Sequence, residues 1–393
     1  MEIAKMKIVY YSNFINHHQA NVADELYRLT GGNYSFVELC PIFDWLLKSG
    51  YPDLSTRPYV LQAWKSEENR MKAMEMLYDS DVALFSCPES LKYEVLRAKT
   101  GKLTFDVGER WLKKGWLNLA SPRLLRFLRH YYTTLSHQNV YALCSSAFAS
   151  NDYYKLNCFK DKCFKWGYFT KVEDFPFGSS ANFDVSIEGT GAHLMWCARF
   201  LRWKHPELPV KLAKRLKNRN YKFIIDMYGS GEELEHTKEL AEKLDVMDVV
   251  RFQGNLPNDE ILKQMRHHQI FLFTSDRNEG WGAVLNESMS NGCAVVASDM
   301  IGSVPFLIED GVNGLIFKSE SLDSLETKVV SLLDSVDYRR TIAMNAIKTM
   351  RDVWCPSNAA KQFFALTEAL LTNNNIMIPK IGPCSRAYPI IVK

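Results

Sequence analysis

The sequence has no apolar run long enough to cross a lipid bilayer and no recognisable leader segment. A membrane-spanning helix needs about 20 consecutive apolar residues, and no segment of the chain approaches that length. The first residues, MEIAKMKIVYYSNF, lack the apolar core and the small-residue cleavage site of a secretory leader. These two absences favour a cytoplasmic location.

The chain also lacks the patterns that bind metals or nucleic acids. Its nine cysteines are scattered, and the closest two, Cys158 and Cys163, have no neighbouring histidine pair to complete a zinc motif. The formal net charge is only +3, whereas a dedicated nucleic-acid-binding domain carries a much stronger basic excess. We therefore expect reduced thiols, no bound metal and no nucleic-acid partner.

What the chain does contain is enough apolar material for two domains. Hydrophobic residues make up 47% of its 393 residues and charged residues 24%, values typical of a globular protein. A chain of this length exceeds the size at which a single hydrophobic core stops growing. Two domains with a cleft between them are therefore expected.

Strand-like and helix-like segments alternate along the first half. The β-rich run MKIVYYSNF leads into a loop, INHHQ, and then into ANVADELYRLT, whose apolar residues recur at helical spacing. Further strands are expected around residues 84, 105 and 142. Between residues 171 and 191, Pro, Gly, Ser and Asn interrupt any regular period, which predicts a linker.

A second series of alternating elements follows the linker. Its strand-like segments are HLMWCARF, YKFIIDMYGSG, VVRFQG, IFLFTS, AVVASD and GLIFK, and SNAAKQFFALTEALL reads as a final amphipathic helix. Such alternation predicts an α/β fold with parallel sheets. We expect Rossmann-like domains at residues 1–180 and 181–357, with residues 358–393 forming a C-terminal helix and tail that pack back on the first domain.

The most informative stretch runs from Asn278 to Phe317. It follows the carboxyl end of a predicted strand, which is where ligands bind in open α/β sheets. Gly280 and Gly282 let the backbone approach a ligand before a helix begins, so that free amide groups and the helix dipole face an anion such as diphosphate. Glu279 stands at the mouth of this site. Glu287, about two helical turns on, can accept paired hydrogen bonds from the adjacent hydroxyls of a ribose.

Two basic residues follow the first strand of the second domain in ARFLRWKHPEL. Arg199 offers a fixed fork of donors and Lys204 a compact point charge. Together they could neutralise the charge that develops on a departing nucleoside diphosphate. The pattern thus indicates leaving-group catalysis.

The segments ARFLRWKHPEL, MYGSGEELEHTKELAEKL, VVRFQGNLPNDEI and Asn278–Phe317 resemble, in this order, the nucleotide-binding half of glycosyltransferase family 4. The resemblance covers residues 190–360. It implies the GT-B fold, in which two Rossmann-like α/β domains face each other across a cleft. It also implies a retaining, metal-independent transfer of a hexose from a UDP- or GDP-sugar, with no further cofactor.

The resemblance also implies residue roles. The family's E-x7-E motif corresponds to Glu279, which would contact hexose hydroxyls, and to Glu287, which would contact the ribose. Arg199 and Lys204 would contact the diphosphate. The expected catalytic residues are Arg199, Lys204 and Glu279, and the expected donor-binding residues are Gly280, Trp281, Gly282, Glu287, Gly229 and Gly231. Gly229 and Gly231 fit a tight turn as well as a phosphate contact.

The first half resembles the family by position and architecture alone. His17 and His18 occupy the loop after the first strand, where they could touch phosphate or acceptor, although surface histidines are an equally good explanation. Asp106 and Glu109 fall where family members carry functional groups. The family's usual glycine pair in the first loop is missing, so the donor contacts of that loop do not carry over. An acceptor-binding role is the expectation for this domain.

A basic amphipathic stretch without acidic residues runs from Arg110 to Arg129. Its cations, Arg110, Lys113, Lys114, Arg123, Arg126 and Arg129, are interleaved with tryptophan, leucine and phenylalanine. Such a surface suits an anionic membrane leaflet and a lipid-linked acceptor. A helix that packs its leucines and solvates its charges explains the pattern equally well.

The sequence therefore predicts a glycosyltransferase that acts on a glycan or lipid-linked glycan, in the synthesis of bacterial surface polysaccharide. A sugar-nucleotide epimerase of the same fold is the first alternative, but it would need acid and base residues around the hexose ring. An NAD-dependent oxidoreductase is disfavoured because MYGSGEE lacks the G-x-G-x-x-G spacing. The oligomeric state is not predicted.

Overall fold

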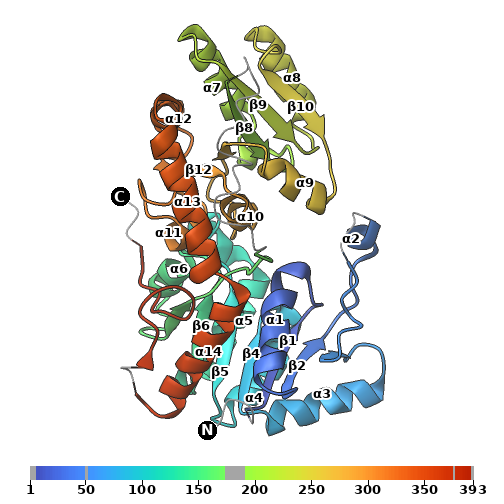
Figure 1. Cartoon of the computed structure of the whole chain (residues 1–393). Coiled ribbons are helices and arrows are strands. Elements are labelled where there is room, and N and C mark those ends of the chain that lie inside the picture. Colours follow the sequence, from blue (N-terminus) through green and yellow to red (C-terminus); the bar gives the residue numbers. More distant parts are fainter. Residues whose placement is uncertain (1–5, 49–51, 173–190, 375–376, 391–393) are drawn as a thin grey trace. The chain divides into compact units, whose positions relative to one another are not determined.

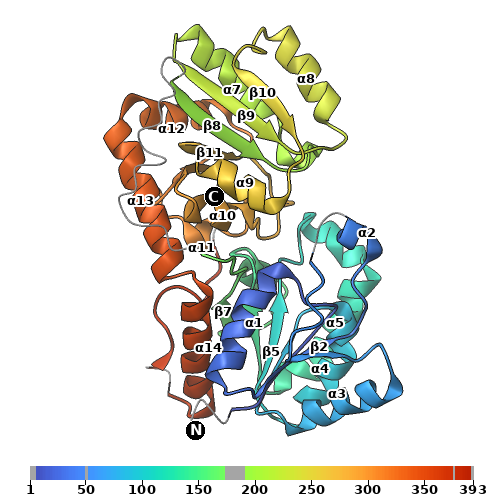
Figure 2. The same cartoon turned by 45° about the vertical axis from the view of Figure 1, so that its right-hand side comes forward.

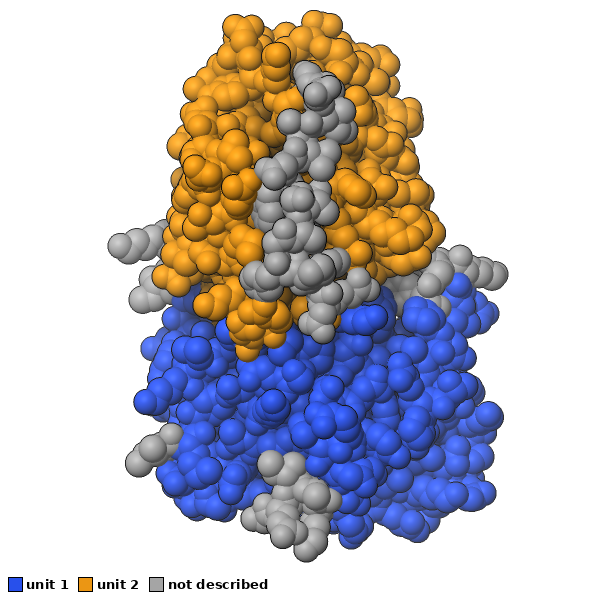
Figure 3. Space-filling model, viewed as in Figure 1, with its two compact units in different colours: residues 1–171, 353–393 blue, residues 172–352 orange. Residues whose placement is uncertain are grey.

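The computed structural model describes residues 6–48, 52–172, 191–374 and 377–390 (Figures 1 and 2). Its contacts divide the chain into two compact units (Figure 3). Unit 1 comprises residues 1–171 and 353–393, and unit 2 comprises residues 172–352. Except at its ends, the expected linker at residues 171–191 lies outside the described residues, and so does the expected domain boundary at residues 180 and 181.

Unit 1 is built on a parallel sheet. Its described strands have the order β3-β2-β1-β4-β5-β6-β7, and every pairing between neighbours is parallel. In chain order the strands are β1 (Ile8–Ser12), β2 (Tyr34–Glu38), β3 (Val60–Gln62), β4 (Val82–Phe85), β5 (Thr104–Gly108), β6 (Val140–Cys144) and β7 (Cys163–Lys165). The strand order reverses between β1 and β4.

Helices connect the strands of unit 1. The α-helices are α1 (His17–Leu29), α2 (Asp44–Lys48), α3 (Glu67–Asp79), α4 (Leu91–Ala98), α5 (Pro122–Thr133), α6 (Ala149–Lys155) and α14 (Pro356–Leu371). Short 3-10 helices are η2 (Pro88–Ser90), η3 (Gly115–Ala120) and η4 (Leu135–His137). The views of Figures 1 and 2 agree that α14 runs beside α1, although the two are more than 300 residues apart in sequence. The final helix is thus part of the same unit as the first.

Unit 2 repeats the architecture. Its described strands have the order β10-β9-β8-β11-β12-β13, again with every neighbour parallel. The strands are β8 (Ala192–Cys197), β9 (Phe223–Tyr228), β10 (Val250–Gly254), β11 (Ile270–Phe273), β12 (Ala294–Ser298) and β13 (Leu315–Phe317). The helices are η5 (Arg202–Lys204), α7 (Glu207–Asn218), α8 (Leu234–Lys243), α9 (Asn258–Met265), α10 (Val284–Ser290), α11 (Val304–Leu307), α12 (Leu322–Asp334) and α13 (Val336–Asp352).

The apolar strands form because both faces of each parallel sheet are covered. Every residue of β4, β9 and β12 is buried, which is the continuous apolar pattern of a sheet with helices on both sides rather than an alternating one. The helices are amphipathic by contrast: α7 buries its leucines, whereas its charged residues are only partly buried. The predicted α/β class with two Rossmann-like sheets is confirmed.

The structure differs from the expected loop at the start of α1. His17 and His18 are the first two residues of the helix rather than part of the loop. The reason is a side-chain cap: the Asn16 carboxamide oxygen accepts hydrogen bonds from the backbone amides of His18 (3.0 Å) and Gln19 (3.2 Å). Such a cap satisfies amides that have no partner within the helix, so the helix begins at His17.

The C-terminal tail, which the sequence pattern leaves unassigned, pairs with the outer strand β7. The backbone amide of Lys165 donates to the carbonyl of Ser385 (2.8 Å), and the amide of Ala387 donates to the carbonyl of Cys163 (3.0 Å). An isolated antiparallel bridge joins Phe164 to Arg386. The tail therefore covers a sheet edge that would otherwise present unpaired backbone groups.

No helix among the described residues has the length and apolar character needed to cross a membrane.

One buried cation in unit 1 joins a helix to a neighbouring turn. Arg97, at the end of α4, is fully buried, and burial lowers its pKa to about 10. Its guanidinium donates to the backbone carbonyls of Leu77 (2.7 Å), Ser80 (2.9 Å) and Asp81 (2.8 Å). It therefore ties α4 to the turn between α3 and β4.

Replacing Arg97 with Met should lower the free energy of unfolding by about 3 kcal/mol or more, because several buried carbonyls lose their donor. The matched control is Arg28→Met, which removes only an exposed pair with Glu25 and should cost less than about 1 kcal/mol. Urea unfolding of the two variants measures the difference. Equal losses would contradict this role for Arg97.

Candidate functional site

The expected site residues of unit 2 gather where the strand order of its sheet reverses. Strands β8 and β11 are neighbours at this point. Arg199 and Lys204 follow β8, and Glu279 follows β11 on the loop that leads into α10. Ligands of open α/β sheets bind at such a reversal, outside the carboxyl ends of the strands. The sequence prediction and the topology therefore point to the same place.

Lys204 and Glu279 form an ion pair at this position. The Lys204 ammonium donates to the Glu279 carboxylate, and the two side chains are only 12% and 10% exposed. The ammonium also lies 4.2 Å from the centre of the Trp203 ring. An ammonium has three donors and a carboxylate has several acceptor positions, so this one contact leaves both groups able to bind a ligand.

Backbone and hydroxyl contacts fix the two segments that carry the pair. The Thr274 hydroxyl donates to the backbone carbonyl of Lys204 (2.6 Å) and accepts from the indole nitrogen of Trp196 (2.8 Å). The amide of Asp276 donates to the carbonyl of Trp203 (3.0 Å). These bonds join β8, η5 and the end of β11, so that Lys204 and Glu279 are held facing each other.

Arg199 differs from Lys204 in being exposed. Within the described residues its side chain makes no hydrogen bond or ion pair. Its backbone is nevertheless fixed, because the next residue, Phe200, donates to the carbonyl of Ser230 (2.9 Å) and accepts from the amide of Glu233 (3.0 Å). Arg199 is therefore a cation on a fixed backbone whose fork of donors faces solvent.

Gly229 and Gly231 allow their backbone to lie close to the backbone of Ala198 and Phe200. A Cβ on Gly229 would lie 1.9 Å from the carbonyl oxygen of Ala198, and one on Gly231 would lie 2.3 Å from that of Phe200. Both glycines also have positive φ angles, +131° and +153°. Both glycines therefore permit a close backbone approach to the segment that carries Arg199, and their contact with a phosphate stays a prediction.

Gly282 is required by its conformation and by its neighbours. Its φ is +82°, and a Cβ would lie 2.5 Å from the Phe273 ring. The neighbouring Gly280 is buried. Trp281, which was also expected to bind the donor, has a side chain that is 1% exposed, and its indole nitrogen donates to Asn286 (2.8 Å). Its side chain therefore packs in the interior, and its contact with the donor stays a prediction.

Glu287 lies in α10 and is 8% exposed. Burial raises the pKa of its carboxyl to about 7, and a hydrogen bond with Asn258 of α9 offsets only part of this rise. The charge of Glu287 also acts on Cys197, the last residue of β8, whose pKa is raised to about 12 mainly by burial. Lys204 acts on the same thiol in the opposite direction. Glu287, β8 and Lys204 are therefore close together.

Sequence reasoning missed a buried network near the amino ends of β8 and β11. Asp226 of β9 accepts from His268 (3.0 Å), whose other ring nitrogen lies 2.7 Å from the carbonyl of Gln264. Burial alone would raise the pKa of Asp226, but hydrogen bonds with His193, His268 and Gln253 lower it. The sequence signal was weak, because these residues are far apart in the chain and only the sheet brings them together.

Among the described residues, two groups have the ligand types that metals use, with ligand atoms within 4.8 Å of one another: His193, Asp226 and His268, and His205, Asp276 and Glu320. The first group is bonded among its own members and to Gln264 and Gln253. In the second, His205 lies 3.1 Å from Glu207 and 3.6 Å from Asp276. Hydrogen bonds within the first group account for its arrangement.

In unit 1, the structure connects His18 with Glu109. The His18 ring stacks on Tyr168 (4.9 Å between centroids), and the Tyr168 hydroxyl donates to Glu109 (2.9 Å). Burial lowers the pKa of His18 to about 3 and also lowers that of His17. Both imidazoles are therefore uncharged at neutral pH and could contact a phosphate only as neutral donors. Sequence reasoning missed Tyr168, which joins the two expected segments.

Asp106 does not belong to this group. It lies within β5, 8% exposed, and burial raises its pKa to about 7. The nearby carboxyl of Glu94 on α4 is also buried, and burial and the charge of Asp106 raise its pKa well above the usual range. Asp106 and Glu94 therefore form a pair of buried carboxyls between β5 and α4.

The cations of the basic stretch fall into two groups, those that pair with an acidic residue and those that are exposed. Arg110 requires a correction as a membrane-facing residue, because its side chain is 9% exposed and pairs with buried Asp152 (3.4 Å). Lys113 is one-third exposed and pairs with Glu109 (2.9 Å). The remaining cations of the stretch, Lys114, Arg123, Arg126 and Arg129, are exposed.

Comparison with known proteins matches residues 182–349 to the family model described as "Glycosyl transferases group 1". Among curated relatives, poly(glycerol-phosphate) alpha-glucosyltransferase of Bacillus subtilis (strain 168) is 26% identical over 37% of this chain and 21% of its own length. D-inositol 3-phosphate glycosyltransferase of Corynebacterium glutamicum (strain R) is 27% identical over 45% of this chain and 43% of its own length. The chain thus spans less than half of these relatives.

Solved structures match over nearly the whole chain. Anabaena Alr3699/HepE in complex with UDP has a TM-score of 0.67 at 15% identity, covering 93% of this chain and 100% of that one. The lipopolysaccharide outer core galactosyltransferase WaaB, in its apo form, has a TM-score of 0.67 at 14% identity, covering 94% and 99%. The matched family residues lie entirely within unit 2. Residues 182–349 of unit 2 therefore match the group 1 family of glycosyl transferases, in line with the resemblance to family 4, and the chain as a whole has the GT-B fold.

Proposed function

We propose that this chain is a glycosyltransferase that moves a hexose from a nucleoside diphosphate sugar to an acceptor hydroxyl. The observation that carries the proposal is the ion pair of Lys204 and Glu279 at the strand-order reversal of unit 2. A diphosphate needs a cation, and a hexose needs a hydrogen-bond acceptor close to it. This pair supplies both within one contact.

In the proposed reaction, Lys204 and Arg199 stabilise the departing diphosphate. The bond between the anomeric carbon and the diphosphate oxygen breaks, and its electron pair leaves with the nucleoside diphosphate. The acceptor oxygen forms the new glycosidic bond, and its proton passes to the departing diphosphate. Attack from the face of the leaving group, through an oxocarbenium-like state, would retain the anomeric configuration. Because two side chains provide the positive charge, the proposed reaction uses no metal or cofactor.

Glu279 and Glu287 would bind the two sugars of the donor. Glu279 would accept bonds from the hexose, and Glu287, near the carboxyl end of β8, would accept bonds from the ribose. A UDP-sugar is the first donor to test, because Alr3699/HepE was solved with UDP. A GDP-sugar is the second.

Unit 1 would bind the acceptor, a glycan or lipid-linked glycan of bacterial surface polysaccharide. Support comes from WaaB, which is named as a lipopolysaccharide galactosyltransferase, and from the poly(glycerol-phosphate) glucosyltransferase. His17, His18 and Glu109 are the proposed acceptor contacts. The protein would work in the cytoplasm, with peripheral contact of its exposed basic residues to the inner face of the membrane.

A thermal-shift screen against UDP, GDP, ADP and their sugar conjugates tests the donor. We expect one nucleotide to raise the melting temperature, because a ligand that binds the folded state stabilises it. Glu287→Ala should weaken this response at least about tenfold in nucleotide concentration, since hydrogen bonds to a charged group contribute about 1.5–3 kcal/mol. Glu239→Ala, an exposed acid on α8, is the control. No response to any nucleotide would contradict the proposal.

Lys204→Ala should lower kcat for nucleoside diphosphate release by on the order of 100-fold, because charge stabilisation of the leaving group is lost. KM should change much less. Lys243→Ala, an exposed lysine on α8, should leave both constants unchanged. A double variant, Lys204→Met with Glu279→Gln, removes both charges and separates a catalytic loss from the instability of an unpaired buried carboxylate. An unchanged kcat in both Lys204 variants would contradict the role.

The raised pKa of Glu287 predicts a dependence of stability on pH. A carboxyl with a folded-state pKa of about 7 binds its proton more tightly in the folded than in the unfolded protein. The contribution of Glu287 to the stability of the folded protein is therefore complete below the pKa that its carboxyl has in the unfolded protein, and it is lost as the pH rises through about 7. Relative to Glu287→Gln, the wild type should lose about 3 kcal/mol between pH 4.5 and 8. Urea unfolding across this range measures it, and a constant difference between the two proteins would contradict the burial argument.

A further inference from the structure

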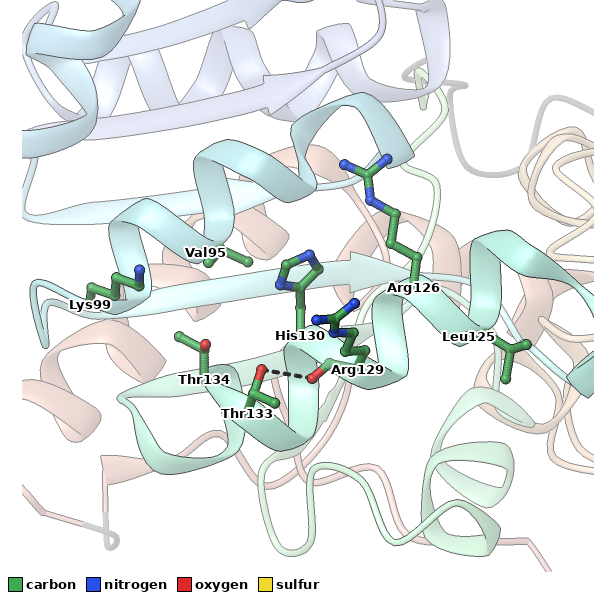
Figure 4. A pocket seen from close by; sticks show the side chains of 8 residues that line it. All are labelled: Val95, Lys99, Leu125, Arg126, Arg129, His130, Thr133 and Thr134. Carbon is green, nitrogen blue, oxygen red and sulfur yellow. Dashed lines mark hydrogen bonds between the residues drawn. The ribbon is translucent and has the colours of Figure 1, made fainter.

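A groove of about 870 Å³ opens between α4 and α5 in unit 1. Figure 4 shows that one wall comes from α4 and the following turn, and the other from α5 and its C-terminal end. The groove is lined by Val95, Lys99, Leu125, Arg126, Arg129, His130, Thr133 and Thr134. The groove therefore lies between two elements, and the sequence pattern indicated only one of them, α5.

The groove carries positive charge that the described protein does not neutralise. Lys99, Arg126 and Arg129 are exposed, and none of them forms an ion pair with a described residue. Other exposed cations do: Lys72 pairs with Glu68, for example. The acid on α4, Glu94, is buried and does not line the groove.

The sequence around the groove keeps acids away from it. Residues 110–151, which include all of α5, contain no aspartate or glutamate. Three cations within one groove, without an acid on α5, attract an anion with several oxygens, such as a phosphate.

Large apolar side chains lie exposed beside these charges. Leu125, which lines the groove, is 52% exposed. Trp116 and Leu117 of η3, the element that directly precedes α5, are 59% and 79% exposed. No residue of η3 is buried. Basic residues beside exposed tryptophan and leucine are typical of surfaces that insert shallowly into a lipid interface.

We propose that the groove between α4 and α5 binds the phosphate of an anionic phospholipid, while Trp116 and Leu117 insert among the neighbouring lipids. A lipid fits better than a free phosphate because only a lipid surface would also cover the exposed apolar side chains. Lys99, in the turn after α4, lines the opposite wall from Arg126 and Arg129 and would add to the attraction for the anionic lipid surface. The inference deepens the proposed membrane contact and is independent of the donor site in unit 2.

The test measures binding of the full chain to phosphatidylcholine vesicles with and without phosphatidylglycerol. The wild type should bind the anionic vesicles at least about tenfold more tightly, because each basic residue near such a surface contributes about a fivefold gain. Arg126→Gln with Arg129→Gln should remove most of this preference, and Lys99→Gln should weaken it about fivefold. Lys243→Gln with Arg251→Gln, two exposed cations of unit 2, should bind as the wild type does.

Lys99→Gln is the decisive variant, because Lys99 lies outside α5. If Lys99→Gln binds the vesicles as tightly as the wild type while the double arginine variant does not, the basic face of α5 alone is the binding site. That result would contradict the proposal that the groove binds the lipid. Trp116→Ser with Leu117→Ser should weaken vesicle binding but leave any effect of inorganic phosphate on the melting temperature unchanged. If inorganic phosphate raises the melting temperature but the protein does not bind the vesicles, the ligand is a free phosphate and the proposal of a lipid ligand is contradicted. Every groove variant should keep its response to the donor nucleotide, so failure of the donor proposal would show separately.

Discussion

The nearly buried ion pair of Lys204 and Glu279 is the interaction on which the proposed site depends. Its two charges come from segments 75 residues apart, and removing one partner would leave an unpaired charge at a cost of about 3–5 kcal/mol. The pair is therefore maintained only if β8 and β11 are neighbours and their following segments are fixed. Thr274 and Trp196 supply that fixation through bonds that join both strands. Parallel topology thus turns two distant motifs into one charged site.

The surrounding residues divide into those that support the site and those that remain available to a ligand. Gly229, Gly231 and Gly282 support it, because a side chain at any of them would collide with a neighbouring backbone or ring. Arg199 is exposed and Glu287 is buried with a raised pKa. The proposed donor would therefore meet one solvated cation, one paired cation and one carboxyl whose charge depends on pH near neutrality.

Much of unit 2 could be predicted from the sequence, because its strands are continuous apolar runs and its site residues follow them directly. Lys204 and Glu279 were predicted for the same site, although nothing in the sequence indicates that they pair. For Trp281, which the family resemblance placed among the donor-binding residues, the sequence gives no sign that its indole bonds to Asn286 in the interior. Contacts between residues that are distant in the sequence were not predicted. Asp152 pairs with Arg110, and Tyr168 connects His18 with Glu109. Such pairs depend on tertiary packing, which spacing along one chain does not encode.

The central claim is that the carboxyl ends of β8 and β11 form a nucleoside diphosphate sugar site. A crystal structure of the protein with the nucleotide that stabilises it tests this claim most directly. In that structure we expect the ribose hydroxyls within hydrogen-bond distance of Glu287 and the diphosphate in contact with Lys204 and Arg199. A nucleotide bound elsewhere, with the Lys204–Glu279 pair untouched, would contradict it.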